Sequence, residues 1–168
     1  MIHVCSLARL NDTVKATGAR HVVTLLGIED HVPLPPGVDA SDYLRLHMHD
    51  ITEPSDGQVT PDVAHVERLV AFVRRWDRAA PMVIHCYAGI SRSTAAAFTT
   101  VCALNPQRDE SDIAMSLRRV SPTAMPNGRI VRLADQILGR DGRMVAAVAG
   151  IGPCVPALQA EPFQLDLE

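Results

Sequence analysis

The sequence has no apolar run of the roughly 18 residues that a membrane-spanning helix requires. It also lacks an N-terminal basic segment followed by an apolar stretch, which is the pattern of a secretory signal. We therefore expect a cytoplasmic protein that does not insert into membranes. The net charge of −3 over 168 residues gives no overall basic field of the kind that nucleic-acid binding usually leaves. We expect no nucleic-acid partner.

Cysteine is scarce, and its four copies are widely spaced: Cys5, Cys86, Cys102 and Cys154. None belongs to a Cys-x-x-Cys pair, which argues against both a zinc site and a disulfide framework. His47 and His49 alternate near a predicted strand end beside Asp50, but no third clustered ligand accompanies them. We expect packing or loop hydrogen bonds from these histidines, and no metal or other cofactor.

Length and composition predict one soluble globular domain, since hydrophobic residues make up 47% of the chain and charged residues 21%. Apolar runs and turn signals predict strands at 2–5 (an edge strand), 21–26, 43–48 and 82–85. Helices are predicted at 7–17, from Thr60-Pro61 onward, after the fourth strand to 104, and at 109–120 and 127–138. This alternation predicts an α/β domain with a central, largely parallel sheet flanked by helices.

The C-terminal stretch has a different character from the rest of the chain. We expect residues 1–143 to form the main domain, and residues 144–168 to be an apolar segment and tail packed on it. The short apolar run 145–152 is followed by Pro153 and Pro156. A partner-binding segment or a frayed tail are the alternatives for this stretch.

The stretch His85-Cys86-Tyr87-Ala88-Gly89-Ile90-Ser91-Arg92-Ser93 lies between a predicted strand and a predicted helix. The free N–H groups and the positive dipole end of such a helix start attract an anion. Arg92 can add a bidentate contact to two phosphate oxygens. The same donors stabilise a thiolate, so Cys86 is predicted to be a nucleophile. This pattern favours covalent phosphoryl transfer over the alternative of a buried structural cysteine beside a surface arginine.

His85-Cys86-x5-Arg92-Ser93 resembles the signature of the cysteine-dependent protein tyrosine phosphatases, and its inner residues resemble the small dual-specificity-like branch, of a bacterial type. The resemblance extends more weakly from about residue 22 to 139, and it implies a protein-tyrosine-phosphatase-like fold. It makes Cys86 the nucleophile and Arg92 the phosphate clamp. It also implies that His85 orients the loop and helps to keep the thiolate ionised, and that Ser93 assists departure of the thiolate. The loop residues implied to bind phosphate are Tyr87, Ala88, Gly89, Ile90, Ser91 and Arg92.

Catalysis also needs a carboxylic acid near the leaving oxygen, and the candidates are Asp50, Glu53 and Asp56. Asp50 follows the end of a predicted strand, as Cys86 does, and ligands gather at the carboxyl ends of parallel strands. The resemblance also places the acid there, so Asp50 is the assignment, while Glu53 and Asp56 are the alternatives. Asn127 is predicted either to cap the last helix or to approach the signature loop.

The uncharged loop residues favour a phosphoprotein or phosphopeptide over a highly charged lipid head group. The predicted substrate is phosphotyrosine, with phosphoserine and phosphothreonine as further candidates. Two other functions remain open. One is a phosphopeptide-binding protein without activity, and the other is a rhodanese-type sulfurtransferase, which also holds a cysteine in an anion-binding loop. The oligomeric state does not follow from the sequence.

Overall fold

The computed structural model describes residues 1–167. Its five strands form one sheet in the order β3-β2-β4-β1-β5. The strands are β1 (Ile2–Ser6), β2 (His21–Leu26), β3 (Tyr43–His47), β4 (Met82–Cys86) and β5 (Phe163–Leu165). The neighbours β3-β2, β2-β4 and β4-β1 are parallel, and β5 is antiparallel to β1. The predicted α/β class with a largely parallel sheet is therefore confirmed.

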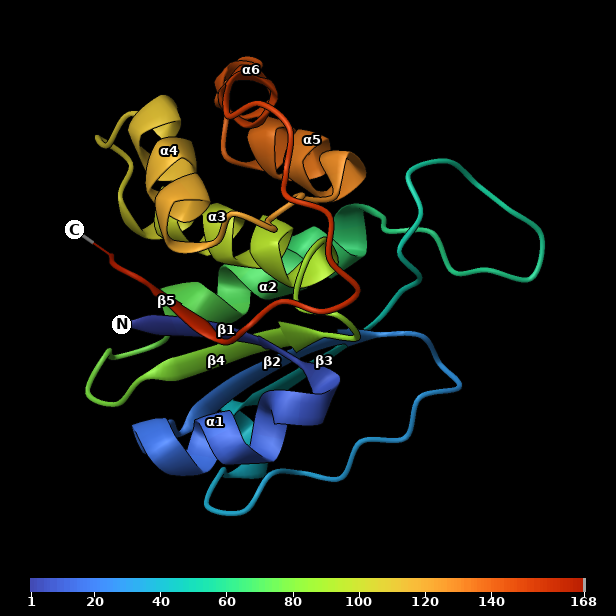
Figure 1. The fold of residues 1–168 in the computed structure, drawn as a ribbon, viewed down its shortest axis with the longest axis vertical. Helices are drawn as coiled ribbons and strands as arrows, with labels where there is room; N and C mark the ends of the chain where they lie inside the picture. Colours follow the sequence, from blue (N-terminus) through green and yellow to red (C-terminus); the bar gives the residue numbers. More distant parts are fainter. Residues whose placement is uncertain (168) are drawn as a thin grey trace.

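Helices cover both faces of the sheet, but unequally (Figure 1). Helix α1 (Leu10–Thr17) lies alone on one face. The other five lie on the opposite face: α2 (Val63–Arg74), α3 (Arg92–Leu104), α4 (Glu110–Val120), α5 (Gly128–Ile137) and α6 (Arg143–Gly150). The buried side chains form a large cluster on the five-helix face and a small cluster against α1. No helix within residues 1–167 is long and apolar enough to cross a membrane.

Side-chain caps decide where several helices begin. Asp109 accepts hydrogen bonds from the backbone at the start of α4, and Asn127 does the same at the start of α5. The predicted start of α2 at Thr60-Pro61 is wrong by two residues. Asp62 is the cap, because its carboxylate accepts the His65 N–H while His65 Nδ1 accepts the Asp62 N–H. This is a capping box with histidine in the place usually taken by glutamate.

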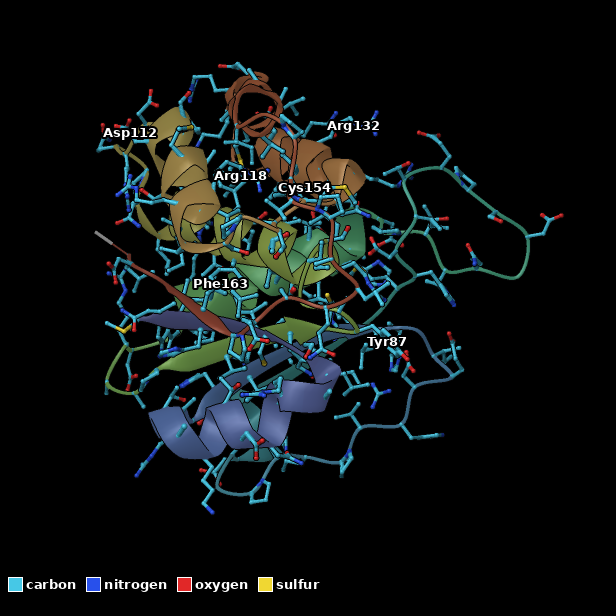
Figure 2. All side chains as sticks on the ribbon, in the orientation of Figure 1. Tyr87, Asp112, Arg118, Arg132, Cys154 and Phe163 are labelled. Carbon is cyan, nitrogen blue, oxygen red and sulfur yellow. The ribbon has the colours of Figure 1, made fainter. Side chains whose placement is uncertain are left out.

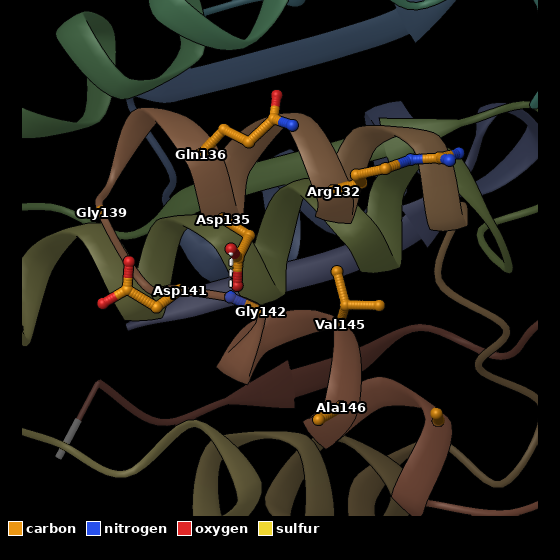
Figure 3. Close-up of a pocket in the computed structure, with 9 residues that line it drawn as sticks. Arg132, Asp135, Gln136, Gly139, Asp141, Gly142, Val145 and Ala146 are labelled. Carbon is orange, nitrogen blue, oxygen red and sulfur yellow. Dashed lines mark hydrogen bonds between the residues drawn. The ribbon is translucent and has the colours of Figure 1, made fainter.

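The C-terminal stretch contributes two regular elements. Helix α6 packs against α4 and α5. Asp135 of α5 accepts a hydrogen bond from Gly142 N at 2.7 Å (Figure 3) and another from Met144 N at 2.9 Å. The chain then returns to the sheet as β5. The prediction that β1 is an edge strand is wrong, because β5 pairs with its outer side. The three residues of β5 follow a proline-rich stretch and carry too short a pattern to be recognised.

Candidate active site

The loop 87–91 joins β4 to α3 and is supported from outside by other parts of the chain. Four of its carbonyl groups accept backbone hydrogen bonds from residues far away in the sequence. The pairs are Leu7 N to Tyr87 O at 3.1 Å, Ala160 N to Ala88 O at 2.9 Å, Met125 N to Ile90 O at 2.9 Å and Asn127 N to Ser91 O at 3.3 Å. These four carbonyls are thereby engaged by residues outside the loop. Ala160 belongs to the C-terminal stretch, so this stretch also supports the loop.

The N–H groups of the loop are free. Within residues 1–167, none of the N–H groups from Ala88 to Ser93 donates to a protein acceptor. Gly89 makes this arrangement possible, since its φ of +76° suits glycine and a Cβ there would lie 2.9 Å from the backbone of Cys5 and Ser6. Successive free amides in such a loop, next to a helix N-terminus, form an anion-binding concavity.

Cys86 and Arg92 lie at the two ends of this concavity. Cys86 Sγ is 3.1 Å from Ser93 Oγ, and both residues are buried. The Arg92 guanidinium is also buried and donates through Nη1 to the Met48 carbonyl at 2.8 Å. Its Nε has no hydrogen-bond partner among the described residues. The geometry thus provides a thiol, a hydroxyl and a cation with an unused donor beside free backbone amides.

His85 lies beneath the loop. Its Nε2 is 2.7 Å from Thr24 Oγ1 on the neighbouring strand β2, and its side chain is fully buried. Burial lowers the pKa of His85 to about 4, so the imidazole is neutral at neutral pH. A neutral ring can orient β4 through Thr24, but it brings no positive charge to the Cys86 sulfur.

Asp50 meets the loop through two hydrogen bonds. Its Oδ1 accepts from Ser91 Oγ at 2.7 Å and from Asn127 Nδ2 at 2.9 Å, while Oδ2 lies 3.9 Å from Arg92 Nε. Asn127 therefore does both things that the sequence left open, since its Oδ1 caps α5 and its backbone N–H donates to the Ser91 carbonyl of the signature loop. Its Nδ2 also holds Asp50. The hydroxyl of Ser91 had no predicted role beyond the loop. It now appears as the direct link between loop and carboxylate.

Glu53 and Asp56, unlike Asp50, make no hydrogen bond to the loop within residues 1–167. Both are exposed, and neither has a hydrogen-bond or ion-pair partner within residues 1–167. The segment that carries them extends away from the body of the molecule between β3 and α2 (Figure 1). A hollow of about 570 Å³ lies between the start of this segment and the residues just before α5, and Asp50, Glu53 and Ser91 line it. Of the three carboxylates, only Asp50 is thus hydrogen-bonded to the loop within the described residues.

Tyr87 is exposed, whereas Cys5 and Cys102 are buried. The Tyr87 side chain is 65% exposed and lies at the end of the sheet toward which the parallel strands point (Figure 2). Cys5 packs in the cluster on the α1 face, whereas Cys86 packs in the cluster on the opposite face. Burial raises the pKa of Cys5 to about 11 and that of Cys102 to about 12, so both remain thiols at neutral pH.

Of the two histidines near the end of β3, only His49 makes loop hydrogen bonds through its side chain, whereas the buried Nδ1 of His47 has no hydrogen-bond partner among the described residues. His49 Nε2 lies 3.2 Å from Glu29 Oε1, and its Nδ1 accepts the Val59 N–H at 2.8 Å. Within residues 1–167, no group of three or more histidine, cysteine or acidic side chains could hold a metal ion.

The sequence of this region matches a known family. The family model described as protein-tyrosine phosphatase matches residues 35–123, which is more than half of the chain and includes Asp50, Cys86 and Arg92. The chain belongs to the protein-tyrosine phosphatase family. A comparison with curated protein sequences finds no significant match. The resemblance read from the signature is therefore correct at the level of the family.

Solved structures agree with this protein-tyrosine phosphatase assignment. The fold resembles DUSP15, with 18% identity, a TM-score of 0.65 and 89% of both chains covered. It resembles human DUSP28, with 18% identity and a TM-score of 0.62 over 83% of this chain and 92% of that one. It also resembles PTPMT1 in complex with PI(5)P, with 15% identity and a TM-score of 0.63 over 89% and 94%. The chain thus has a fold similar to that of small dual-specificity phosphatases, and its bacterial type stays a prediction.

Proposed function

We propose that this phosphatase hydrolyses phosphomonoesters of proteins, with phosphotyrosine as its main substrate, through a cysteinyl-phosphate intermediate. The observation that carries the proposal is the loop whose carbonyls are bound from outside while its amides are free. Such a loop binds a phosphate dianion without a metal ion, because the amides and Arg92 supply the compensating positive charge. Phosphoserine and phosphothreonine are secondary substrates.

In the first step, the Cys86 sulfur attacks phosphorus and the bond between phosphorus and the leaving oxygen breaks. Asp50 gives its proton to that oxygen, so the leaving group departs as a neutral alcohol or phenol. In the second step, Asp50 takes a proton from water while the water oxygen attacks phosphorus. The bond from phosphorus to sulfur breaks, and the Ser93 hydroxyl, 3.1 Å from the sulfur, stabilises the departing thiolate. His85 takes part only as the neutral support of the strand.

The uncharged side chains around the free amides support a protein substrate over a polyphosphorylated lipid. Tyr87, Ala88, Ile90 and Ser91 bring no charge to the loop, whereas a head group with several phosphates requires further cations. Exposed Tyr87 offers an apolar and aromatic surface at the loop, which suits the ring of phosphotyrosine.

The test is turnover by the purified protein of a phosphotyrosine peptide, a phosphoserine peptide and a phosphoinositide in vesicles. We expect the highest kcat/KM on the phosphotyrosine peptide, and no turnover by Cys86→Ser or Arg92→Ala, because nucleophile and clamp act as one unit. Tight peptide binding without turnover would instead identify a phosphopeptide-binding protein. Turnover of thiosulfate alone would identify a sulfurtransferase.

A further inference from the structure

Arg129, in the first turn of α5, contacts both limbs of the segment that follows Asp50. Its Nε donates to the Pro61 carbonyl at 2.6 Å, and its Nη1 donates to the Thr52 carbonyl at 3.1 Å. Thr52 lies two residues after Asp50, and Pro61 lies just before α2 begins. One half-buried guanidinium therefore bridges the outgoing and the returning limb of the segment. A planar group with several fixed donors is well suited to hold two carbonyls at once.

The segment has little other support. Its tip, residues 53–57, is exposed and extends away from the fold (Figure 1). The base is closed by a reciprocal pair in which His49 N donates to Val59 O and Val59 N donates to His49 Nδ1, each at 2.8 Å. Besides His49, two side chains from outside bond to the backbone of residues 51–61 within the described part of the chain. They are Arg129 and, at a longer 3.4 Å, Asn127.

We propose that Arg129 is a positioning residue for the general acid: it fixes the backbone beyond Asp50 so that the carboxyl stays against Ser91 at the mouth of the phosphate loop. The proposal rests on the proposed function and deepens it. Asp50 is held through one oxygen only, and its side chain is 37% exposed, so a shift of the backbone would carry the acid away from the leaving oxygen. Displacements of about 1 Å can cost about a hundredfold in rate.

Within the described residues, the Arg129 side chain makes no hydrogen bond to the loop that binds phosphate. Loss of the guanidinium should therefore impair proton donation and leave phosphate binding intact. For Arg129→Ala we expect kcat on a phosphotyrosine peptide to fall about tenfold to a hundredfold. An ester with an activated nitrophenyl leaving group needs little protonation, so its kcat should fall much less. Inhibition by vanadate, which probes the loop and Arg92, should be unchanged.

Arg132→Ala is the matched control, because Arg132 is exposed on the same helix and has no hydrogen-bond or ion-pair partner within residues 1–167. It should behave as the wild type on both substrates. Arg129→Lys provides a second variant if the alanine variant is unstable, and it should retain an intermediate rate because one ammonium can reach only one of the two carbonyls.

The decisive comparison combines Arg129→Ala with Asp50→Asn. If Arg129 acts through Asp50, the double variant is no slower than Asp50→Asn alone, because the acid is already absent. A further loss in the double variant, or equal losses by Arg129→Ala on both esters with weaker vanadate inhibition, would show a general structural role and overturn the proposal. A wild-type protein without any phosphatase activity would overturn the proposed function instead, and that result is seen before any variant is made.

Discussion

Replacement of Asp50 by asparagine should remove the acid and leave its position almost unchanged. Asp50 accepts hydrogen bonds from Ser91 Oγ at 2.7 Å and Asn127 Nδ2 at 2.9 Å, both through Oδ1. The amide oxygen of asparagine can accept the same two bonds, whereas its NH₂ group cannot transfer a proton as a carboxylic acid does. General acid catalysis contributes roughly 10² to 10⁴ in rate. We therefore expect Asp50→Asn to lower kcat on a phosphotyrosine peptide by roughly 10² to 10⁴.

The assay for this prediction compares aryl phosphates whose leaving groups differ in basicity. The wild type should show little dependence on the leaving group, and Asp50→Asn should show a steep one, with the smallest loss on activated fluorinated or nitrophenyl esters. Asp56→Asn and Glu53→Gln should retain the wild-type profile, because both side chains lie on the exposed segment beyond Asp50. A steep dependence in Asp56→Asn but not in Asp50→Asn would refute the assignment and would require the segment to fold back over Cys86.

Three further predictions concern the loop and its support. Iodoacetate at pH 6 should modify Cys86 and not Cys102, because the pKa of Cys102 is raised to about 12 and its thiol is almost entirely protonated. Phosphate should block the modification of Cys86, and equal labelling of both cysteines would contradict the prediction. Gly89→Ala should abolish activity, while Gly57→Ala, at a similar φ of +74° but in open space, should cost only about 1 kcal/mol of stability measured by urea unfolding. Stability should fall by up to about 3 kcal/mol between pH 6.5 and 4, because unfolded His85 takes up a proton that the folded state excludes; a His85→Gln variant with the same pH slope would refute this.

Much of the parallel sheet could be predicted from the sequence. The strand over residues 21–26 was predicted with the observed bounds, since a continuous apolar run ending in glycine is typical of a strand buried on both faces. The helix over 109–120 was predicted to within one residue, and the cap at Asn127 was one of two predicted roles, because a helix start and its capping side chain are adjacent in the chain. Features that depend on residues adjacent in the chain could thus be predicted from the sequence.

Features that depend on contacts between residues far apart in the chain could not be predicted from the sequence. The pairing of β5 with β1 joins opposite ends of the chain, and the bond from Ala160 to the loop belongs to the same long connection. Arg129 carried no signal, because an arginine in the first turn of a helix is usually a solvated charge. Its partners Thr52 and Pro61 are more than sixty residues away in the sequence. The candidate catalytic residues could be predicted from the signature, whereas the residues that hold them in position could be identified only from the structure.

The central claim, a covalent phosphoryl group on Cys86, can be tested by rapid quenching of the protein with an activated aryl phosphate, followed by mass spectrometry of its peptides. An acid quench at early times should show one added phosphoryl group on the peptide that contains Cys86. Asp50→Asn should reach a similar or higher level of this species, since the water attack that removes it also uses Asp50. Cys86→Ser should show none. Product release by the wild type with no phosphorylated Cys86 peptide at any quench time would contradict the account.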